Sequence, residues 1–533
     1  MKHLNHRIII IQTALFLAAG ALVLQLLRIN HSDRTIEASA KQGSYTLHIP
    51  LSTGVIYDRH FARLTNDEPV YYAVVNPTPD AITALFSKVK HHDQIQDNLH
   101  NNVPFCCEVS DNEISNPNVI VLEGSQNSVL HTAQHLVGYR QEGKGVCGLE
   151  AAYTDWLQSY DVSSTVTFSV NATGNVLQGL NSKEIQNGTP NGGVVTFLSR
   201  PIQRITETAL QAAAPNPAAA VVMDVTSGEI VAMASTPVYD INHLENAMED
   251  KDSPFLNRAL CAYPVGSVFK LVIAASALEN GLTSEYMYEC SGHTEINGQM
   301  FRCHKPTGHG LLDMQHALIG SCNPYFISLC QLLTPEQLHK TAVSLGFGQS
   351  VFLADGIISA AGSLQSENEL QIEAEKANFA FGQGKLLATP LQIASMTACI
   401  ANDGIYCTPQ LVKGLTEDGC TILHPIDSTQ KRVLSSSTAE KIREMMYSVL
   451  TEGEHPLGKP KYTTAGGKTS TAQTGQYADD GTEYCHAWMT GYFPADTPKY
   501  AVTVFVENGG SGNQSAAPIF REIIDHIVMM DSN

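Results

Sequence analysis

One long uncharged stretch near the N-terminus constrains the architecture of this chain more than any other feature. Residues Ile8 to Leu27, IIIIQTALFLAAGALVLQLL, contain no charged side chain. A helix of this length crosses about 30 Å of hydrocarbon. The apolar run continues past Ala19-Gly20-Ala21, so we expect an uncleaved signal anchor rather than a removed signal peptide. The rest of the 533-residue chain should then lie on one side of a membrane.

The composition is that of a folded protein with more than one domain. Hydrophobic residues make up 43% of the 533 residues and charged residues 16%, and one hydrophobic core seldom organises a chain of this length. We predict three parts: residues 1–30 with the anchor and a short cytoplasmic tail, residues 31–200 next to the membrane, and residues 201–533. The net charge of -20 would repel a phosphate backbone. Nucleic acid is therefore excluded as a partner.

The twelve cysteines form no C-x-x-C pair and no Cys/His cluster at zinc-finger spacing. We expect mostly free thiols, no structural metal and no cofactor. Cys290 and Cys303 flank a short polar loop and could be bridged, although spacing alone does not establish a disulfide. His309 and His486 are interpreted as structural hydrogen-bonding residues rather than metal ligands.

The second half carries the stronger secondary-structure signals. The segments AAAVVMDV and EIVAMAS, separated by Thr226-Ser227-Gly228, predict a β-hairpin. Tyr500 to Val506 predicts another strand, and residues 517–530 follow the apolar period of a helix. With helical segments between, this order predicts a mixed α/β (α+β) fold whose sheet takes its edges from both ends of the domain. The first half has weaker extended runs, such as Val70 to Val75.

The first chemical motif joins Ser267 to Lys270. Gly266 to Lys270 opens an apolar run, LVIAASALEN, that Gly281 can terminate, which predicts a buried helix. The three-residue spacing puts both side chains on one face, with Ser267 at the N-terminus where the helix dipole favours negative charge. A lysine made neutral by burial and by a second cation can take the serine proton.

Two further motifs follow in order. Ser321-Cys322-Asn323 lies between two amphipathic segments and therefore at a helix junction. Lys468-Thr469-Ser470-Thr471 follows two glycines in a β-prone run. Bare copies of the three patterns also occur at Ser87/Lys90, Ser428/Lys431, Ser125, Ser169, Ser366, Ser511 and Lys340. Order and context distinguish the three motifs from these copies.

Together the motifs resemble those of the class B penicillin-binding proteins, the monofunctional D,D-transpeptidases of peptidoglycan synthesis. The resemblance extends through Asn257-Arg258-Ala259, Pro264 to Lys270, His309-Gly310, Gly382-Gln383-Gly384 with Thr389-Pro390, Gly466 to Gln473, and His486 to Gly491. It implies a transpeptidase domain like that of serine β-lactamases in residues 201–533, with a central antiparallel sheet between helices. The anchor, Gly54 to Arg59 and His135 to Tyr139 resemble the family's pedestal, a dimerisation-type domain assigned to residues 31–200.

The resemblance also implies a role for each motif residue. Ser267 would attack the penultimate D-Ala carbonyl of a stem peptide, with Lys270 as its base and Ser321 relaying the proton to the leaving D-Ala. Asn323 would hold the donor peptide and Lys270, while Lys468 would tune Ser321. Thr469, Ser470 and Thr471 are the expected substrate-binding residues, of which Thr469 and Thr471 would bind the terminal carboxylate. The backbone N–H groups of Ser267 and Thr471 would form the oxyanion hole.

The implied partners are peptidoglycan stem peptides, β-lactam antibiotics that trap Ser267, and a SEDS-type glycosyltransferase. The implied location is the cell membrane, with a single-pass anchor and the catalytic domain outside the cytoplasm. Two other functions stay open. Glu367 to Gln371 resembles the loop that activates the deacylating water of a serine β-lactamase, and a weakened enzyme would act as a scaffold or β-lactam sensor.

Several positions depart from the family pattern. Ser470 replaces the usual Gly and Val265 the usual Pro, while the pedestal has Thr53-Gly54 for the usual Arg-Gly and His60-Phe61 where Asn-Gly is common. Strand alternation puts Ser470 on the face of Lys468, toward the helix start. We expect its side chain to crowd this gap, so that Ser470→Gly speeds acylation about 5- to 30-fold. In the alternative, Ser470 donates a compensating hydrogen bond and carries no cost.

Overall fold

The chain forms two compact units in the computed structural model, which describes residues 2–30, 43–92, 95, 103–128, 131–171, 176–177, 183–213, 216–426, 428–454 and 456–532. The first unit comprises Met1–Thr53, Glu68–Gln126 and Asp161–Pro190, and the second comprises Gly54–Asp67, Asn127–Tyr160 and Asn191–Asn533. Both segments that resemble a pedestal, residues 54–59 and 135–139, belong to the second unit. The division at residues 30 and 200 stays a prediction, and residue 31 itself lies outside the described residues.

The N-terminal helix α1 (Lys2–Asn30) contains the predicted anchor. Within it, Ile9–Arg28 is long and apolar enough to cross a membrane, with a hydropathy of 2.1. Its apolar side chains face outward, and Phe16 is 82% exposed. Hydrocarbon would cover such a surface, whereas a helix of a soluble core would bury it in protein.

The first unit is built from two three-stranded antiparallel sheets. One has the order β1 (Ser44–Ser52), β8 (Val162–Ser169), β9 (Lys183–Asn187), and the other β4 (Phe105–Val109), β3 (Glu68–Val75), β5 (Val119–Gln126). β3 confirms the predicted extended run. Its Val74 and Val75 belong to two different cores, as the two faces of a strand require. Helix α3 (Pro79–Phe86) begins at the N-cap Thr78 with proline in its first turn.

A five-stranded antiparallel sheet organises the second unit. Its order is β12 (Ile230–Thr236), β11 (Ala218–Asp224), β26 (Tyr500–Val506), β25 (Glu483–Phe493), β24 (Gly466–Tyr477). β11 and β12 are the predicted hairpin, and β26 is the predicted strand. The edges therefore come from both ends of the domain, as expected.

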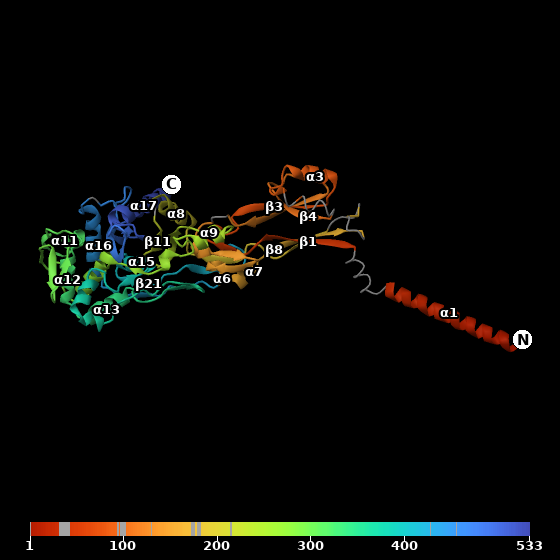
Figure 1. The fold of residues 1–533 in the computed structure, drawn as a ribbon, viewed down its shortest axis with the longest axis horizontal. Helices are drawn as coiled ribbons and strands as arrows, with labels where there is room; N and C mark the ends of the chain where they lie inside the picture. Colours follow the sequence, from red (N-terminus) through yellow and green to blue (C-terminus); the bar gives the residue numbers. More distant parts are fainter. Residues whose placement is uncertain are drawn as a thin grey trace. The chain divides into compact units, whose positions relative to one another are not determined.

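Helices cover both faces of this sheet. Figure 1 shows α8 (Arg200–Ala213) and α17 (Ala517–Asp531) on one side of β11 and α15 (Pro390–Ala401) on the other. Ala218, Ala220 and Val222 pack in the core shared with α8 and α17. The intervening residues Ala219, Val221 and Met223 pack with α15. This alternation confirms the predicted sheet between helices, because a strand buried on both faces is apolar throughout.

The remaining elements of the second unit surround the sheet and the catalytic motifs. The short strands pair as β2 (Val55–Tyr57), β10 (Gly193–Thr196) and β22 (Val412–Thr416); β6 (Tyr139–Gln141) and β7 (Lys144–Cys147); β13 (Tyr263–Pro264) and β20 (Leu387–Ala388); β14 (Tyr288–Cys290) and β17 (Gly310–Leu312); β15 (His293–Ile296) and β16 (Gln299–Arg302); β18 (Phe352–Ala354) and β19 (Ile357–Ile358); β21 (Ile405–Cys407) and β23 (Gln430–Arg432). The helices are α5 (Gln134–Val137), α6 (Gly148–Ala152), α7 (Thr154–Gln158), α9 (Leu244–Glu249), α10 (Lys270–Glu279), α11 (Met314–Ile319), α12 (Asn323–Gln331), α13 (Pro335–Ser344), α14 (Glu373–Phe379) and α16 (Ser436–Thr451).

Candidate active site

Ser267 lies in a 3-10 turn, Gly266–Phe269, that leads directly into α10. Lys270 is the first residue of α10 and is completely buried. Gly266 has a φ of +64°, and its N–H donates to Gly382 O at 2.8 Å. A Cβ on Gly266 would collide with Ser470 Oγ. Glycine is therefore needed here, both for the backbone conformation and for the close approach of β24.

Ser321 is positioned by the end of helix α11. Its φ is +48°, its N–H donates to Leu318 O at 3.2 Å, and Cys322 N–H donates to Ala317 O at 2.9 Å. These two bonds make a Schellman motif with Ser321 at the left-handed position that glycine usually takes. Asn323 then begins α12. The predicted helix junction is confirmed, and its turn presents Ser321 and Asn323 to Lys270.

The amine of Lys270 is the centre of the site. Lys270 Nζ lies 3.0 Å from Ser267 Oγ, 3.2 Å from Ser321 Oγ, 2.7 Å from Ser321 O and 2.7 Å from Asn323 Oδ1. Asn323 Nδ2 donates to Arg302 O at 3.1 Å, which turns the amide oxygen toward the lysine. The two oxygens at 2.7 Å can only accept hydrogen bonds. A neutral amine satisfies both with its two hydrogens and keeps its lone pair for a serine hydroxyl.

Burial and charge favour this neutral amine. Burial lowers the pKa of Lys270 well below its usual range, and the nearby Lys468 lowers it further. Lys468 is 1% exposed, and its own burial lowers its pKa to about 8. Two ammonium groups in one desolvated region repel each other, so the more deeply shifted one gives up its proton first. Lys270 is thereby suited to act as a base, while Lys468 retains a positive charge.

Strand β24 contains the third motif and packs against Gly266, the first residue of the turn that contains Ser267. Lys468 and Ser470 are buried on one face, whereas Thr471 is exposed on the other. Thr471 Oγ1 accepts a hydrogen bond from Gly512 N at 3.2 Å. Ser470 Oγ donates to Val265 O at 2.9 Å. The hydrogen bond named in the alternative is therefore present, and the effect of Ser470→Gly on the acylation rate stays a prediction.

The other copies of the motif patterns lie in ordinary structural roles. Lys90 pairs with Glu108, Ser366 Oγ donates to Glu369 Oε2 at 2.9 Å, and Lys340 lies within α13. His486 Nδ1 accepts from Asn508 N at 3.1 Å, so its hydrogen-bonding role is confirmed. Glu369 pairs with the exposed Lys385 at 2.6 Å, and Glu367 is exposed. Neither glutamate is bonded to the catalytic motifs, unlike the glutamate that a β-lactamase requires.

A cluster of four possible metal ligands lies directly behind the second motif: Cys290, Cys303, His309 and Cys322. One ligand atom from each lies within 4.8 Å of all the others, and Cys303 Sγ is 3.5 Å from His309 Nδ1. A tetrahedral zinc site with Zn–S bonds of 2.3 Å separates its sulfurs by about 3.8 Å. Three cysteines and one histidine are a complete ligand set for structural Zn²⁺. We call these four residues the Cys/His cluster.

The Cys/His cluster was missed in the sequence because its members are far apart in the chain. Cys290 ends β14, His309 precedes β17, and these two strands pair. Cys303 N–H donates to Gly292 O at 2.8 Å, which brings the end of β16 to the same place. All twelve cysteines are free thiols, so the open possibility of a Cys290–Cys303 bridge is not realised. Sequence spacing alone predicts a structural role for His309. It does not show that the fold places three thiols beside this histidine.

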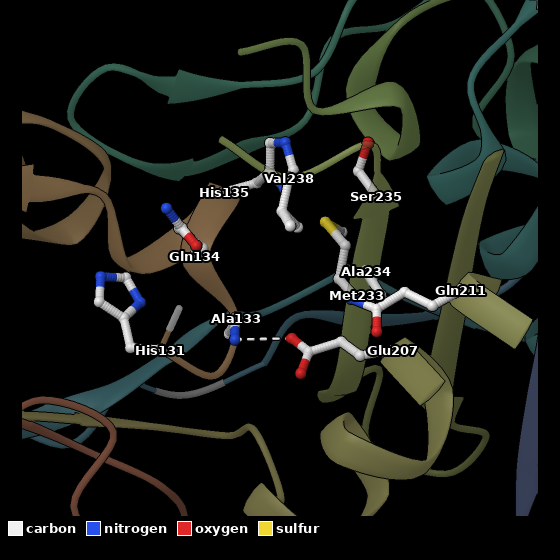
Figure 2. Close-up of a pocket in the computed structure, with 10 residues that line it drawn as sticks. All are labelled: His131, Ala133, Gln134, His135, Glu207, Gln211, Met233, Ala234, Ser235 and Val238. Carbon is white, nitrogen blue, oxygen red and sulfur yellow. Dashed lines mark hydrogen bonds between the residues drawn. The ribbon is translucent and has the colours of Figure 1, made fainter. Parts of the chain in front are cut away.

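A separate polar cavity of about 60 Å³ lies elsewhere in the second unit. Figure 2 shows Glu207, His131 and Gln134 around it, with Ala133 N–H donating to Glu207 Oε1 at 2.7 Å. Burial raises the pKa of Glu207. This volume admits a few water molecules but no peptide. None of the three motifs lines it.

Comparison with known families decides the class of protein. Residues 218–525 match the model described as penicillin binding protein transpeptidase domain. The chain belongs to this family. The match includes all three motifs in the order Ser267/Lys270, Ser321/Asn323, Lys468/Thr469. The chain is a class B penicillin-binding protein and a serine-type D,D-transpeptidase, as the resemblance implied.

The similarity to related proteins covers almost the whole chain. Stage V sporulation protein D of Bacillus subtilis is 29% identical over 91% of this chain and 80% of its own length. Peptidoglycan D,D-transpeptidase MrdA of Acinetobacter baumannii is 26% identical over 95% of this chain and 86% of its own. A solved structure titled for a peptidoglycan synthase complex that coordinates polymerization and crosslinking has a TM-score of 0.70, at 26% identity, over 97% of this chain and 98% of that one.

Proposed function

We propose that this enzyme cross-links peptidoglycan stem peptides through an acyl-enzyme on Ser267. The observation that carries the proposal is the placement of Ser267 Oγ 3.0 Å from a buried lysine amine, whose two nearest oxygens, Ser321 O and Asn323 Oδ1, can only accept hydrogen bonds. Lys270 takes the Ser267 proton as Oγ attacks the penultimate D-Ala carbonyl. The backbone N–H groups of Ser267 and Thr471 stabilise the oxyanion, at about 100- to 1,000-fold per donor.

Collapse of the tetrahedral intermediate releases the terminal D-Ala. The C–N bond breaks, and the leaving nitrogen receives the proton from Lys270 through Ser321, whose Oγ is 3.2 Å from Nζ. Lys468 holds a positive charge beside this relay, and Thr469 with Thr471 bind the carboxylate of the terminal D-Ala. An acceptor amine then attacks the ester carbon, and Ser267 Oγ leaves with its proton restored. The roles of Asn323 are to orient Lys270 and to hold the donor peptide.

A fluorescent penicillin tests this function against its two alternatives. A β-lactam ring opens on Ser267 in the same way, but its leaving nitrogen stays attached, so the ester persists. We expect one stable adduct per chain, mapped to Ser267 by mass spectrometry. Rapid turnover would instead indicate a β-lactamase, and a folded protein without label would indicate a scaffold or a sensor that has lost acylation.

The apolar helix α1, the one candidate membrane span among the described residues, supports a cell-membrane location with residues beyond about 30 outside the cytoplasm, where the wall substrate lies. Protease added to intact spheroplasts should then digest the second unit. Full protection would contradict this orientation. We also propose a SEDS-type glycosyltransferase as the partner, because the similar solved structure is titled for a complex of polymerization and crosslinking. Co-purification of a polytopic glycosyltransferase with the detergent-extracted full chain tests this partner.

We further infer that the Cys/His cluster binds one structural Zn²⁺. Cys303 and Cys322 are hydrogen-bonded to each other, which lowers the pKa of the Cys303 thiol, and a thiolate is the form that binds zinc. Elemental analysis of protein purified without added metal should give about one zinc per chain, reduced to a small fraction in Cys290→Ser. The control Cys420→Ser, an exposed thiol outside the cluster, should keep the metal. Zinc content equal in both variants would refute the site.

A further inference from the structure

The buried hydroxyl of Ser470 ties the catalytic strand to the segment that carries the nucleophile. Ser470 is 3% exposed and donates to Val265 O at 2.9 Å. On the neighbouring strand β25, Trp488 lies directly opposite Ser470 in the register. Trp488 Nε1 donates to Pro264 O at 2.9 Å. Two adjacent side chains of the sheet thus bind two consecutive carbonyls just before Gly266 and Ser267.

We call these two hydrogen bonds the clamp. It connects the strand that carries one proposed oxyanion donor, the N–H of Thr471, to the segment that carries the other, the N–H of Ser267. Ser470 directly precedes Thr471, and Val265 lies two residues before Ser267. The packing between the two segments leaves no slack, because a Cβ on Gly266 would collide with Ser470 Oγ and come 3.2 Å from Ala472 Cα. On its other side, β24 is bound by Gly512, whose N–H donates to Thr471 Oγ1 at 3.2 Å. A shift of Val265 would therefore change the distance between the two donors.

Because residue 265 is a valine and not a proline, the bond from Ser470 Oγ to Val265 O matters more for the backbone conformation at this position. Val265 has φ -95° and ψ -46°, whereas the ring of a proline would hold φ near about -65°. Valine leaves the backbone before the nucleophile free to adopt other conformations, and its carbonyl has the Ser470 hydroxyl as a fixed donor. The two positions of the catalytic motifs at which the chain departs from the family pattern are thus bonded to each other.

We propose that Ser470 is a positioning residue that sets the separation of the oxyanion donors through its bond to Val265 O. The inference rests on the proposed function, because it assigns Ser470 to the same acylation step. The hydroxyl does not touch the substrate, since it is buried and directed at a backbone carbonyl. Its effect is on the transition state, in which the carbonyl oxygen gains charge and needs both donors at their correct distance.

The test measures acylation of Ser470→Ala and Ser470→Gly by benzylpenicillin, with the reversible binding step separated from the covalent step. We expect both variants to acylate about tenfold more slowly at saturating penicillin, with little change in the dissociation constant of the reversible complex. Faster acylation of Ser470→Gly would support the crowding hypothesis and overturn the clamp. Rates within twofold of wild type for both variants would also overturn it.

A matched control separates positioning from general stability. Ser276 is equally buried on α10, and its Oγ donates to Gln337 O at 3.2 Å. Ser276→Ala should lower the melting temperature as Ser470→Ala does, but should acylate at the wild-type rate. If Ser470→Ala is unfolded at the assay temperature, Ser470→Cys fills the site with a slightly larger side chain, weakens the hydrogen bond, and should show the same slower covalent step. Equal slowing by Ser276→Ala would reduce the role of Ser470 to stability.

A second measurement examines the coupling of positions 265 and 470. If the Ser470 bond acts by holding Val265, then Val265→Pro, which moves φ toward about -65°, should remove most of the effect of Ser470→Gly. The slowing in the double variant should be smaller than the product of the two single effects. A double variant that slows by that product would show independent sites and overturn the clamp. Loss of all labelling in the wild-type protein would refute the proposed function instead.

Discussion

The catalytic triangle (Ser267, Lys270 and Ser321) and the Cys/His cluster both include residues of one short segment, Ser321-Cys322-Asn323. The two groups differ in how the fold brings their residues together. In Ser321-Cys322-Asn323, the outer two residues bond to Lys270, while the middle residue, Cys322, belongs to the Cys/His cluster. The catalytic side depends on spacings of a few residues at helix ends. The cluster depends on four positions spread over residues 290–322 and on two strand pairings, β14 with β17 and β15 with β16. Cys322 lies between Ser321 and Asn323, so a metal bound at Cys322 would hold the segment that carries both side chains in place.

The largest effect that separates the two regions should come from Ser267→Ala. This change removes the nucleophile and one small hydroxyl from a half-exposed turn, so covalent penicillin labelling should vanish while the melting temperature stays close to wild type. Intact-protein mass spectrometry measures the adduct. Ser87→Ala, the matched control at a chance copy of the motif, should label normally, and an adduct on Ser267→Ala would move the nucleophile elsewhere.

Lys270→Ala should slow acylation by about 100- to 10,000-fold, the usual contribution of a positioned general base. The alanine removes the amine that bonds Ser267 Oγ and leaves the Asn323 and Ser321 oxygens without their donor. Stopped-time labelling with fluorescent penicillin gives the rate. Lys340→Ala, in the chance copy of the third motif on α13, should retain full activity. A rate within tenfold of wild type would show that another group is the base.

Loss of the metal should affect the catalytic triangle less than loss of either catalytic residue. Removing zinc with a chelator, or replacing Cys322 by Ser, frees one side of the segment between Ser321 and Asn323. We expect about 10- to 100-fold slower acylation together with a lower melting temperature, as is usual when the support of a metal site is lost. Readdition of Zn²⁺ should restore the chelated wild type but not Cys322→Ser. If the zinc-free protein is acylated at the wild-type rate, the Cys/His cluster does not affect the catalytic triangle.

Near neutral pH the smallest effect is the pH dependence that the two lysines of the catalytic motifs give to acylation. Below the lowered pKa of Lys270 the amine is protonated and cannot accept the serine proton, so acylation should rise with pH through that value. Above about 8, Lys468 loses its charge and the rate should fall again. The profile of the second-order acylation rate between pH 5 and 10 measures both limbs, and about tenfold is lost per pH unit beyond each pKa.

The variant Lys468→Gln identifies the alkaline limb of that profile. It carries no charge at any pH, so its residual acylation should rise to a plateau without the decrease above about 8. A decrease that persists in Lys468→Gln would assign the alkaline limb to another group.

Much of the fold was predictable because the relevant signals are local. The hairpin β11/β12, strand β26 and helix α17 follow from alternation and helical period alone. The buried helix after Lys270 follows from its uninterrupted apolar run. The first unit was less predictable. Apolar and polar residues alternate only weakly along its short strands. The chain also passes between the two units more than once, so a boundary at a single residue cannot describe the division.

The sequence by itself determined the candidate catalytic residues and their order, because Ser267, Lys270, Ser321 and Lys468 are placed by helix ends and a strand that local patterns encode. Only the tertiary structure decided what lies against them. The Ser470 hydroxyl bonds to Val265 across 205 positions, and Cys290 meets His309 through the pairing of β14 with β17. Such contacts depend on how separate elements pack, and packing distances between distant segments leave no periodic trace in the chain.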